Sequence, residues 1–74
     1  MKAMQALKEA ATRSETPLTR IGPTFGKAPA YVSSICTRGS TPRTDTLAKM
    51  LDVCGFALCA IPKSEVPSSA IVIE

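Results

Sequence analysis

The chain has 74 residues and a formal net charge of +3, with three cysteines and no histidine. A chain of this length forms one small domain, and the lack of histidine, of a glycine-rich phosphate loop and of zinc-type cysteine spacing argues against an enzyme, a cofactor or a metal centre. The charge is uneven, because residues 1–43 carry seven basic and two acidic side chains whereas residues 44–74 carry two basic and four acidic ones. On charge alone, this asymmetry fits a first half that faces a polyanion and equally an ordinary solvated surface.

Residues 2–13 have the pattern of an amphipathic helix. Ala3, Leu7, Ala10 and Ala11 recur at helical spacing and form one narrow apolar face. The other positions are rich in residues that favour helices. We therefore expect a first helix that ends before Ser14.

A second, short helix is predicted next. Thr16 before Pro17 is a helix-start signal, because threonine caps free amides and proline loses no useful donor at the first helical position. Pro23 falls inside this helix, so we expect the helix to be short or distorted there. Gly26 is expected to end it, because glycine tolerates the left-handed backbone of a helix C-terminus.

A turn at residues 27–28 leads to a third helix from Pro29 to Cys36, and residues 37–44 have the glycine, proline, serine and threonine content of a loop. A fourth helix opens at Thr44 or Asp45 and stops at Gly55. The apolar side chains that we expect to form the core of these helices are Leu18, Ile21, Val32, Ile35, Leu47 and Leu51.

The tail after Gly55 predicts two strands. Residues 56–61 follow a strand-like period, and residues 69–74 are short and β-branched, with a two-proline loop at 62–68. An isolated two-stranded hairpin is barely stable in water, so we expect the strands to be covered by the helices or to pair across a dimer. The chain then divides into a helical domain, 1–55, and a strand–loop–strand element, 56–74, with a predicted dimer interface at Phe56, Leu58, Ile61, Ile71 and Ile73.

The cysteines and the apolar runs bear on the compartment. Three cysteines leave one over in any disulfide framework, so we expect free thiols in a reducing cytoplasm. The N-terminal stretch lacks the continuous apolar core of a secretory signal, and no apolar run approaches the roughly 20 residues that span a membrane. We therefore expect a cytoplasmic protein without membrane contact.

The stretch from Thr16 to Gly55 carries an ordered set of positions, which are Ile21, Phe25-Gly26, Val32-Ser33-Ser34-Ile35, Pro42, Thr46-Leu47 and Met50-Leu51. With this set the stretch resembles the lambda-repressor-like (Xre or Cro-type) helix-turn-helix domains. The resemblance implies a mainly α domain of four to five helices. It also places Gly22 where the family favours alanine, a residue small enough for two helices to cross closely.

The resemblance further implies that the helix from Pro29 to Cys36 is a recognition helix whose early residues reach base edges in the major groove of double-stranded DNA. The DNA-binding residues implied by it, with the cations of the turn and the following loop, are Lys27, Ala28, Pro29, Ala30, Tyr31, Ser33, Ser34, Thr37, Arg38 and Arg43. The recognition helix offers no arginine for guanine and no asparagine or glutamine for adenine. One domain is therefore expected to bind weakly and to discriminate poorly.

These features predict a sequence-specific transcription regulator of bacterial or phage type. We expect a repressor that acts as a homodimer on a palindromic operator, with recognition helices about one DNA turn, roughly 34–36 Å, apart. An alternative from another class is an antitoxin-like interaction module, which binds a partner protein through its C-terminal strands and uses DNA binding only for autoregulation. The sequence allows both.

Overall fold

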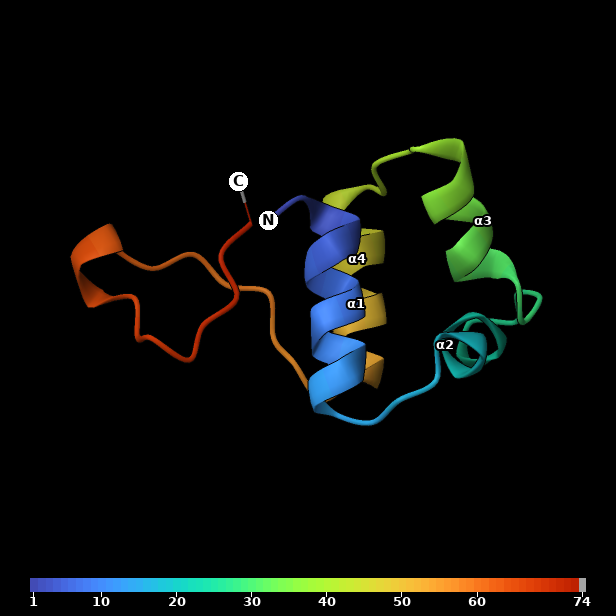
Figure 1. Cartoon of the computed structure of the whole chain (residues 1–74), viewed down its shortest axis with the longest axis horizontal. Helices are drawn as coiled ribbons and strands as arrows, with labels where there is room; N and C mark the ends of the chain where they lie inside the picture. Colours follow the sequence, from blue (N-terminus) through green and yellow to red (C-terminus); the bar gives the residue numbers. More distant parts are fainter. Residues whose placement is uncertain (74) are drawn as a thin grey trace.

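The chain folds as four α-helices followed by an extended C-terminal tail (Figure 1). In the computed structural model, which describes residues 1–73, the helices are α1 (Ala3–Arg13), α2 (Leu18–Thr24), α3 (Tyr31–Arg38) and α4 (Thr44–Val53), and the tail contains one 3-10 turn, η1 (Lys63–Glu65). The predicted, mainly helical fold is confirmed. None of these helices is both long and apolar enough to cross a membrane.

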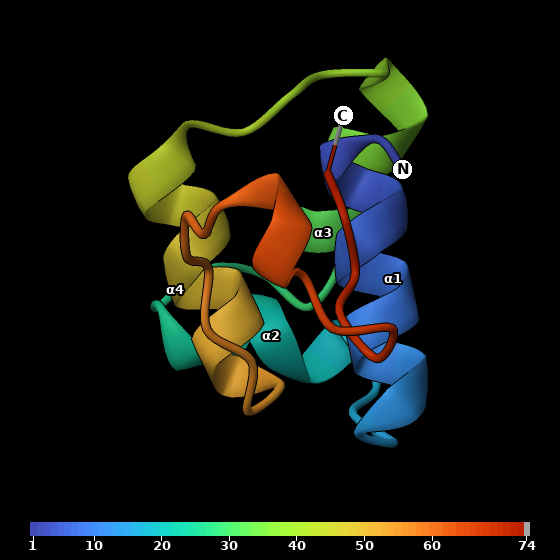
Figure 2. The same cartoon turned by 90° about the vertical axis from the view of Figure 1, so that its left-hand side faces the viewer.

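The core lies where the four helices meet. α1 packs beside α4, and α2 packs against both α3 and α4 (Figures 1 and 2). Each helix contributes one large, fully enclosed apolar side chain to this centre, and these are Leu7, Ile21, Val32 and Met50. Burial of one such side chain contributes about 1.5–3 kcal/mol to the stability of the fold. These four residues therefore stabilise the packing of all the helices.

The predicted core is largely confirmed. Buried side chains include Ile21, Val32, Ile35, Leu47 and Leu51. Leu18 is the exception, because it is only half-buried and packs at the edge of the core.

All four helices end with the same backbone arrangement. The residue that leaves each helix has a left-handed backbone, with φ values of 76°, 68° and 77° at Gly26, Gly39 and Gly55 and of 55° at Glu15 after α1. The amide of the residue that follows donates to the carbonyl oxygen five residues earlier, at 2.9–3.2 Å. This is the Schellman motif, which satisfies carbonyls that a helix end leaves free. The predicted stops at Gly26 and Gly55 are confirmed.

The start of α2 differs in detail from the prediction. The helix begins at Leu18, Pro17 precedes it, and no side chain caps it. The Thr16 hydroxyl lies 2.9 Å from the Ser14 hydroxyl instead of on the free amides of the helix. Pro23 lies in the last turn of a helix of seven residues, which confirms the prediction of a short helix.

The predicted C-terminal strands are wrong, because residues 56–73 form no strand. Residues 56–61 run away from the helices to η1, and residues 66–73 return to the N-terminal end of α1 without a backbone ladder between the two limbs (Figures 1 and 2). The odd and even positions of residues 56–61 are equally apolar, so the alternation does not define one buried face of a strand. Pro62 and Pro67, on either side of η1, lack the N–H that a strand ladder needs and direct the two limbs apart. Glu74, at the end of the second predicted strand, lies outside the described residues.

Side-chain packing and two long-range hydrogen bonds attach the tail to the helices. Arg13 Nη1 on α1 donates to the Ser69 carbonyl oxygen at 2.7 Å, and the amino group of Met1 donates to the Val72 carbonyl oxygen at 3.0 Å. The residues predicted for a dimer interface divide accordingly. Three of them, Phe56, Leu58 and Ile71, pack on the chain's own core, whereas Ile61 and Ile73 are 44% and 37% exposed.

Candidate nucleic-acid interface

α2 and α3 approach each other most closely at Gly22. A Cβ atom at this position would overlap the carbonyl oxygen of Ala28 and would lie 2.9 Å from Cβ of Tyr31. The Gly22 carbonyl oxygen also accepts hydrogen bonds from the amides of Phe25 and Lys27, at 2.9 and 3.0 Å. α2 therefore meets the turn before α3 closely at Gly22, with no room for the Cβ atom of the alanine that the family favours there.

α3 begins at Tyr31, two residues later than predicted. The Tyr31 amide donates to the Ala28 carbonyl oxygen at 3.0 Å, and the Ser34 amide donates to the Ala30 carbonyl oxygen at 2.9 Å. Pro29 and Ala30 therefore form an exposed turn in front of the helix. Because proline lacks an N–H, it sits in this turn without leaving a donor unsatisfied.

One side of α3 is free of the protein core. Val32 and Ile35 are buried on the inner side. The exposed side carries four of the predicted DNA-binding residues, Ser33, Ser34, Thr37 and Arg38. At about 100° per residue, these four side chains spread over roughly 140° of the helix surface. The structure thus brings these four side chains onto one small, polar surface, which we name the α3 face.

Two hydroxyl groups of the α3 face donate their protons within the helix. Ser33 Oγ donates to the Ala30 carbonyl oxygen at 3.1 Å, and Thr37 Oγ1 donates to the Ser33 carbonyl oxygen at 2.9 Å. Each such bond has a net value of about 0.5–1.5 kcal/mol. The lone pairs of both oxygens remain available as acceptors. Ser34 Oγ is exposed and has no hydrogen bond to any of residues 1–73.

Tyr31 does not lie on the open part of this face. It is half-buried and packs against the core, and Lys27 Nζ lies 6.0 Å from the centre of its ring. A cation over an aromatic ring at an exposed site contributes about 0.5–1 kcal/mol, and 6 Å is the outer limit of this interaction. Tyr31 therefore supports the turn and positions the Lys27 ammonium beside it.

Arg43 lies apart from the α3 face. The loop after Gly39 leads from α3 to the start of α4 (Figure 1). Arg43 is the residue before α4, and its Nε is 3.6 Å from Oδ1 of Asp45. Both side chains are largely exposed, so this ion pair contributes little to stability. Arg38 remains at the C-terminal end of the α3 face and has no acidic partner among residues 1–73.

One charge feature of this region was missed by motif-based reasoning. Between Thr16 and Thr44 the sequence has no acidic residue and four basic ones, which are Arg20, Lys27, Arg38 and Arg43. Arg20, which was not among the predicted residues, is exposed on α2. The signal that identifies Arg20 is this run without acidic residues, and the run covers the whole of α2, the turn and α3.

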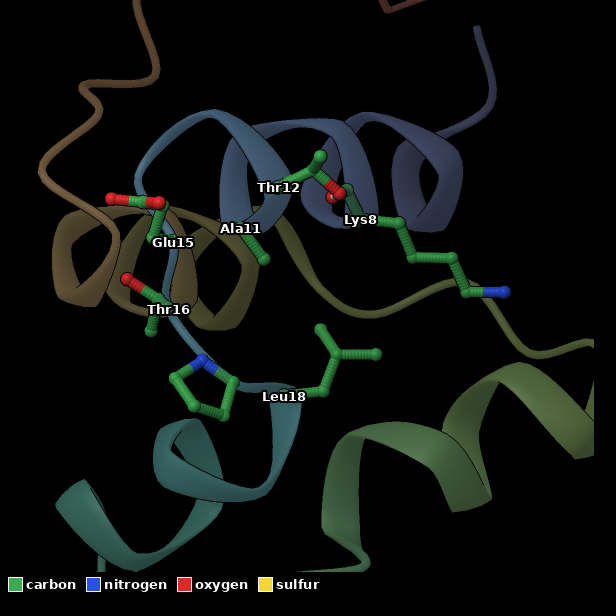
Figure 3. Close-up of a pocket in the computed structure, with 7 residues that line it drawn as sticks. Lys8, Ala11, Thr12, Glu15, Thr16 and Leu18 are labelled. Atoms are coloured by element: carbon green, nitrogen blue, oxygen red, sulfur yellow. Dashed lines mark hydrogen bonds between the residues drawn. The ribbon is translucent and has the colours of Figure 1, made fainter.

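Two hollows in the surface of residues 1–73 lie elsewhere. A shallow one between the end of α1 and the start of α2 has Lys8 and Leu18 at one side and Glu15 and Thr16 at the other (Figure 3). Because it is open and carries charges of both signs, it does not select a ligand by charge. Within residues 1–73 no group of histidine, cysteine and carboxylate side chains is placed to hold a metal ion.

The larger hollow, of about 530 Å³, lies between the tail and the helices α1 and α4. Its walls are mainly apolar and include Leu47 and Leu51 from α4 and Phe56 and Ile71 from the tail, with the Lys63 ammonium as the charged group. The tail, which forms part of its wall, lies on the other side of α1 and α4 from α3 (Figures 1 and 2). The hollow is therefore separate from the α3 face.

The three cysteines are free thiols in different surroundings. Cys59 is exposed, Cys36 is half-buried in α3, and Cys54 is buried after α4. Burial raises the pKa of the Cys54 thiol above its ordinary value, and hydrogen bonding to Ser14 and Thr16 opposes part of this rise. A thiol with a raised pKa is a poor nucleophile, so Cys54 is a structural residue.

Comparisons with protein-family models, with curated proteins and with solved structures give no match for this chain. The geometry and charge of α2, the turn and α3 are therefore the basis for assigning a function.

Proposed function

We propose that this chain is a sequence-specific, DNA-binding transcription regulator that reads DNA with α2, the turn and α3. The observation that carries the proposal is the acid-free, basic run that coincides with two closely crossed helices, one of which has an open polar side. The major groove of B-DNA, about 12 Å wide, admits one helix, and a helix presented at the edge of a small domain is able to enter it. The resemblance of residues 16–55 to lambda-repressor-like domains supports the same assignment.

The roles of the residues follow from their chemistry. Lys27, Arg38 and Arg43 contact phosphates, and Arg20 adds to the local positive potential. Residues at the start and along the open side of α3 contact base edges, and these are Ala30, Ser33, Ser34 and Thr37. Phosphate contacts set the position of the domain, whereas base contacts set the preferred sequence.

We further propose that two copies act together as a homodimeric repressor of bacterial or phage type. The dimer binds a palindromic operator in the cytoplasm. A domain with so few base contacts gains affinity and discrimination when two copies bind two half-sites. Ile61, Val72 and Ile73 are exposed apolar residues of the tail and are the contact that we assign to the second copy. Sedimentation of a monomer across the micromolar range, with and without operator DNA, would remove this part of the proposal.

A second candidate function is an antitoxin-like interaction module. The apolar hollow beside the tail favours it, because a wall of this composition suits a protein segment of the same character. The mass of the native complex purified from its own host distinguishes the homodimeric regulator from the interaction module. A stoichiometric second protein bound at the tail supports the module.

The salt dependence of DNA binding tests the leading proposal. Binding of a fluorescent duplex is measured by anisotropy over a range of salt concentrations, for the wild type and for Arg38→Ala and Arg43→Ala. Each variant is expected to bind all sequences more weakly and to lower the slope of log affinity against log salt by about one.

Lys49→Ala is the matched control, because it removes one exposed cation of α4, outside the α2–α3 region. We expect its salt slope to equal that of the wild type. If Arg38→Ala and Arg43→Ala behave like Lys49→Ala, the assigned docking surface is wrong.

A further inference from the structure

The chemistry of the α3 face bears on which base pairs the proposed DNA-binding surface prefers. Ser33 and Thr37 donate their hydroxyl protons to carbonyl oxygens of their own helix, at 3.1 and 2.9 Å. In that state each oxygen offers acceptor lone pairs alone to a ligand. Donation to a DNA acceptor would require the intrahelical bond to break.

The major groove presents few donors to such acceptors. Guanine shows two acceptors there, N7 and O6, and thymine shows the acceptor O4. The donors are the N6 amino group of adenine and the N4 amino group of cytosine. Ser33 and Thr37 are therefore matched to adenine and cytosine and mismatched to guanine.

Contacts between methyl groups narrow the choice between an A·T and a C·G base pair. Ala30 is exposed at the turn in front of α3, and Thr37 carries a methyl group beside its hydroxyl. Alanine and threonine methyl groups contact the C5-methyl of thymine. An A·T pair supplies both an amino donor and a methyl group, whereas a C·G pair supplies only the donor.

The one cation on α3 does not alter this preference. Arg38 is the last residue of the helix and lies about 100° round its axis from Thr37 and about 140° from Ser33, so we assign it to a phosphate and not to the bases that those two residues face. Lys27 is positioned beside the Tyr31 ring in the turn. Neither cation belongs to residues 30–37, which carry the base contacts that we assign.

We infer that three residues at the start and on the open side of α3 select A·T base pairs, with Ser33 and Thr37 accepting from the adenine amino group and Ala30 and Thr37 contacting the thymine methyl group. Ser34, whose hydroxyl is free to donate or to accept, adds no preference of its own. The inference rests on the proposed DNA binding and specifies the sequence class that this surface selects.

The test begins with duplexes enriched from a random library, followed by atom-level changes in the enriched half-site. Thymine is replaced by uracil, which removes only the methyl group, and adenine is replaced by purine, which removes only the amino group. For the wild type, the inference predicts A·T pairs at the central half-site positions and a roughly 3- to 10-fold weaker affinity for each replacement.

Two variants of Thr37 assign the contacts. Thr37→Ser keeps the hydroxyl and removes the methyl group, so its affinity is expected to become insensitive to uracil at one position. Thr37→Val keeps a methyl group and removes the hydroxyl, so its affinity is expected to become insensitive to purine at one position. Thr12→Val is the matched control, because Thr12 Oγ1 on α1 donates to the Lys8 carbonyl oxygen at 2.9 Å in the same way, away from α3.

The outcomes separate the inference from the function on which it rests. Enrichment of G·C-rich half-sites, or unchanged affinity with uracil and purine, overturns the inference and leaves DNA binding in place. Absence of any enriched or salt-sensitive binding overturns both. Equal effects of Thr37→Val and Thr12→Val would show a structural role for Thr37 and would also overturn the inference.

Discussion

At the scale of single residues, Gly22 is the position on which the α2–α3 crossing depends. Helix propensity alone favours alanine over glycine by about 1 kcal/mol inside a helix. Here, however, the added Cβ meets the Ala28 carbonyl oxygen, which is backbone and is fixed by its bond from the Tyr31 amide. We expect Gly22→Ala to lower the free energy of unfolding by about 1–3 kcal/mol, and thermal unfolding should show a Tm lower by roughly 4–8 °C for each kcal/mol.

The adjacent Pro23→Ala is the control for this prediction. Pro23 is exposed, and its replacement restores a helical amide without adding volume at the crossing. Its Tm should not fall. An increase in the Tm of Gly22→Ala would mean that the helices have room to separate.

Glu15 is the other residue with an unusual backbone. It ends α1 with a φ of 55°, a conformation in which the other three helices have glycine. Left-handed backbone costs a non-glycine residue about 1–2 kcal/mol, and the larger entropy of unfolded glycine offsets part of that. We expect Glu15→Gly to raise the free energy of unfolding by about 0.5–1 kcal/mol in denaturant titrations. Glu15→Gln retains the strain and removes only the charge, so an equal gain in that variant would point to electrostatics instead.

Cys54 links stability to alkaline pH. Its pKa is raised in the folded chain from an ordinary value of 9.0, so the folded state binds the thiol proton more tightly than the unfolded state does. This contribution is complete below about pH 9 and is lost as the pH rises through the folded-state pKa. We expect the urea midpoint to fall as the pH rises above about 9, and to fall less steeply in Cys54→Ala, whose midpoint at neutral pH is lower. A wild-type midpoint that is independent of pH over this range contradicts the assignment.

At the scale of elements, the tail is the part that departs most from a simple helical domain. Ile71 packs on the core, whereas Ile73 is exposed, so the same substitution at the two positions tests the path of the tail. We expect Ile71→Ala to lower the free energy of unfolding by about 1–2 kcal/mol and Ile73→Ala to change it by less than about 0.5 kcal/mol. Denaturant titration at low protein concentration measures both. Equal effects would mean that the tail does not dock as described.

The helices were predictable from the sequence because their signals are local. Alanine-rich spacing in α1, and Gly26 and Gly55 at helix ends, act within one or two turns of chain. The tail was not predictable in the same way, since a strand requires a second segment in register as well as a period. Residues 56–61 have no such partner within residues 1–73.

The candidate site was predictable in part. Ser33 and Ser34 follow from the predicted helix, and the turn follows from Gly26 and the prolines. The prediction placed Thr37 and Arg38 in the following loop, whereas they form the last turn of α3. The inward packing of Tyr31, the ion pair of Arg43 with Asp45 and the protons that Ser33 and Thr37 donate to their own helix depend on three-dimensional contacts, so the sequence pattern does not contain them.

At the scale of the whole molecule, two different surfaces lie on either side of α1 and α4. α3 and the turn form one side, and the tail with its apolar hollow forms the other (Figure 1). Contacts of the exposed tail residues with a second copy or with another protein therefore leave α3 accessible. This separation is what a regulator needs in order to bind DNA and a partner at the same time.

The most direct test of the central claim, that DNA binds at α2, the turn and α3, is a titration of isotope-labelled protein with a duplex, followed by amide chemical shifts in NMR spectra. Non-specific binding at low salt is sufficient for this purpose. We predict that the largest shift changes fall on residues 27–38, with small changes for α1 and for residues 56–73. Changes centred on the tail, or no changes at any duplex concentration, would contradict the account.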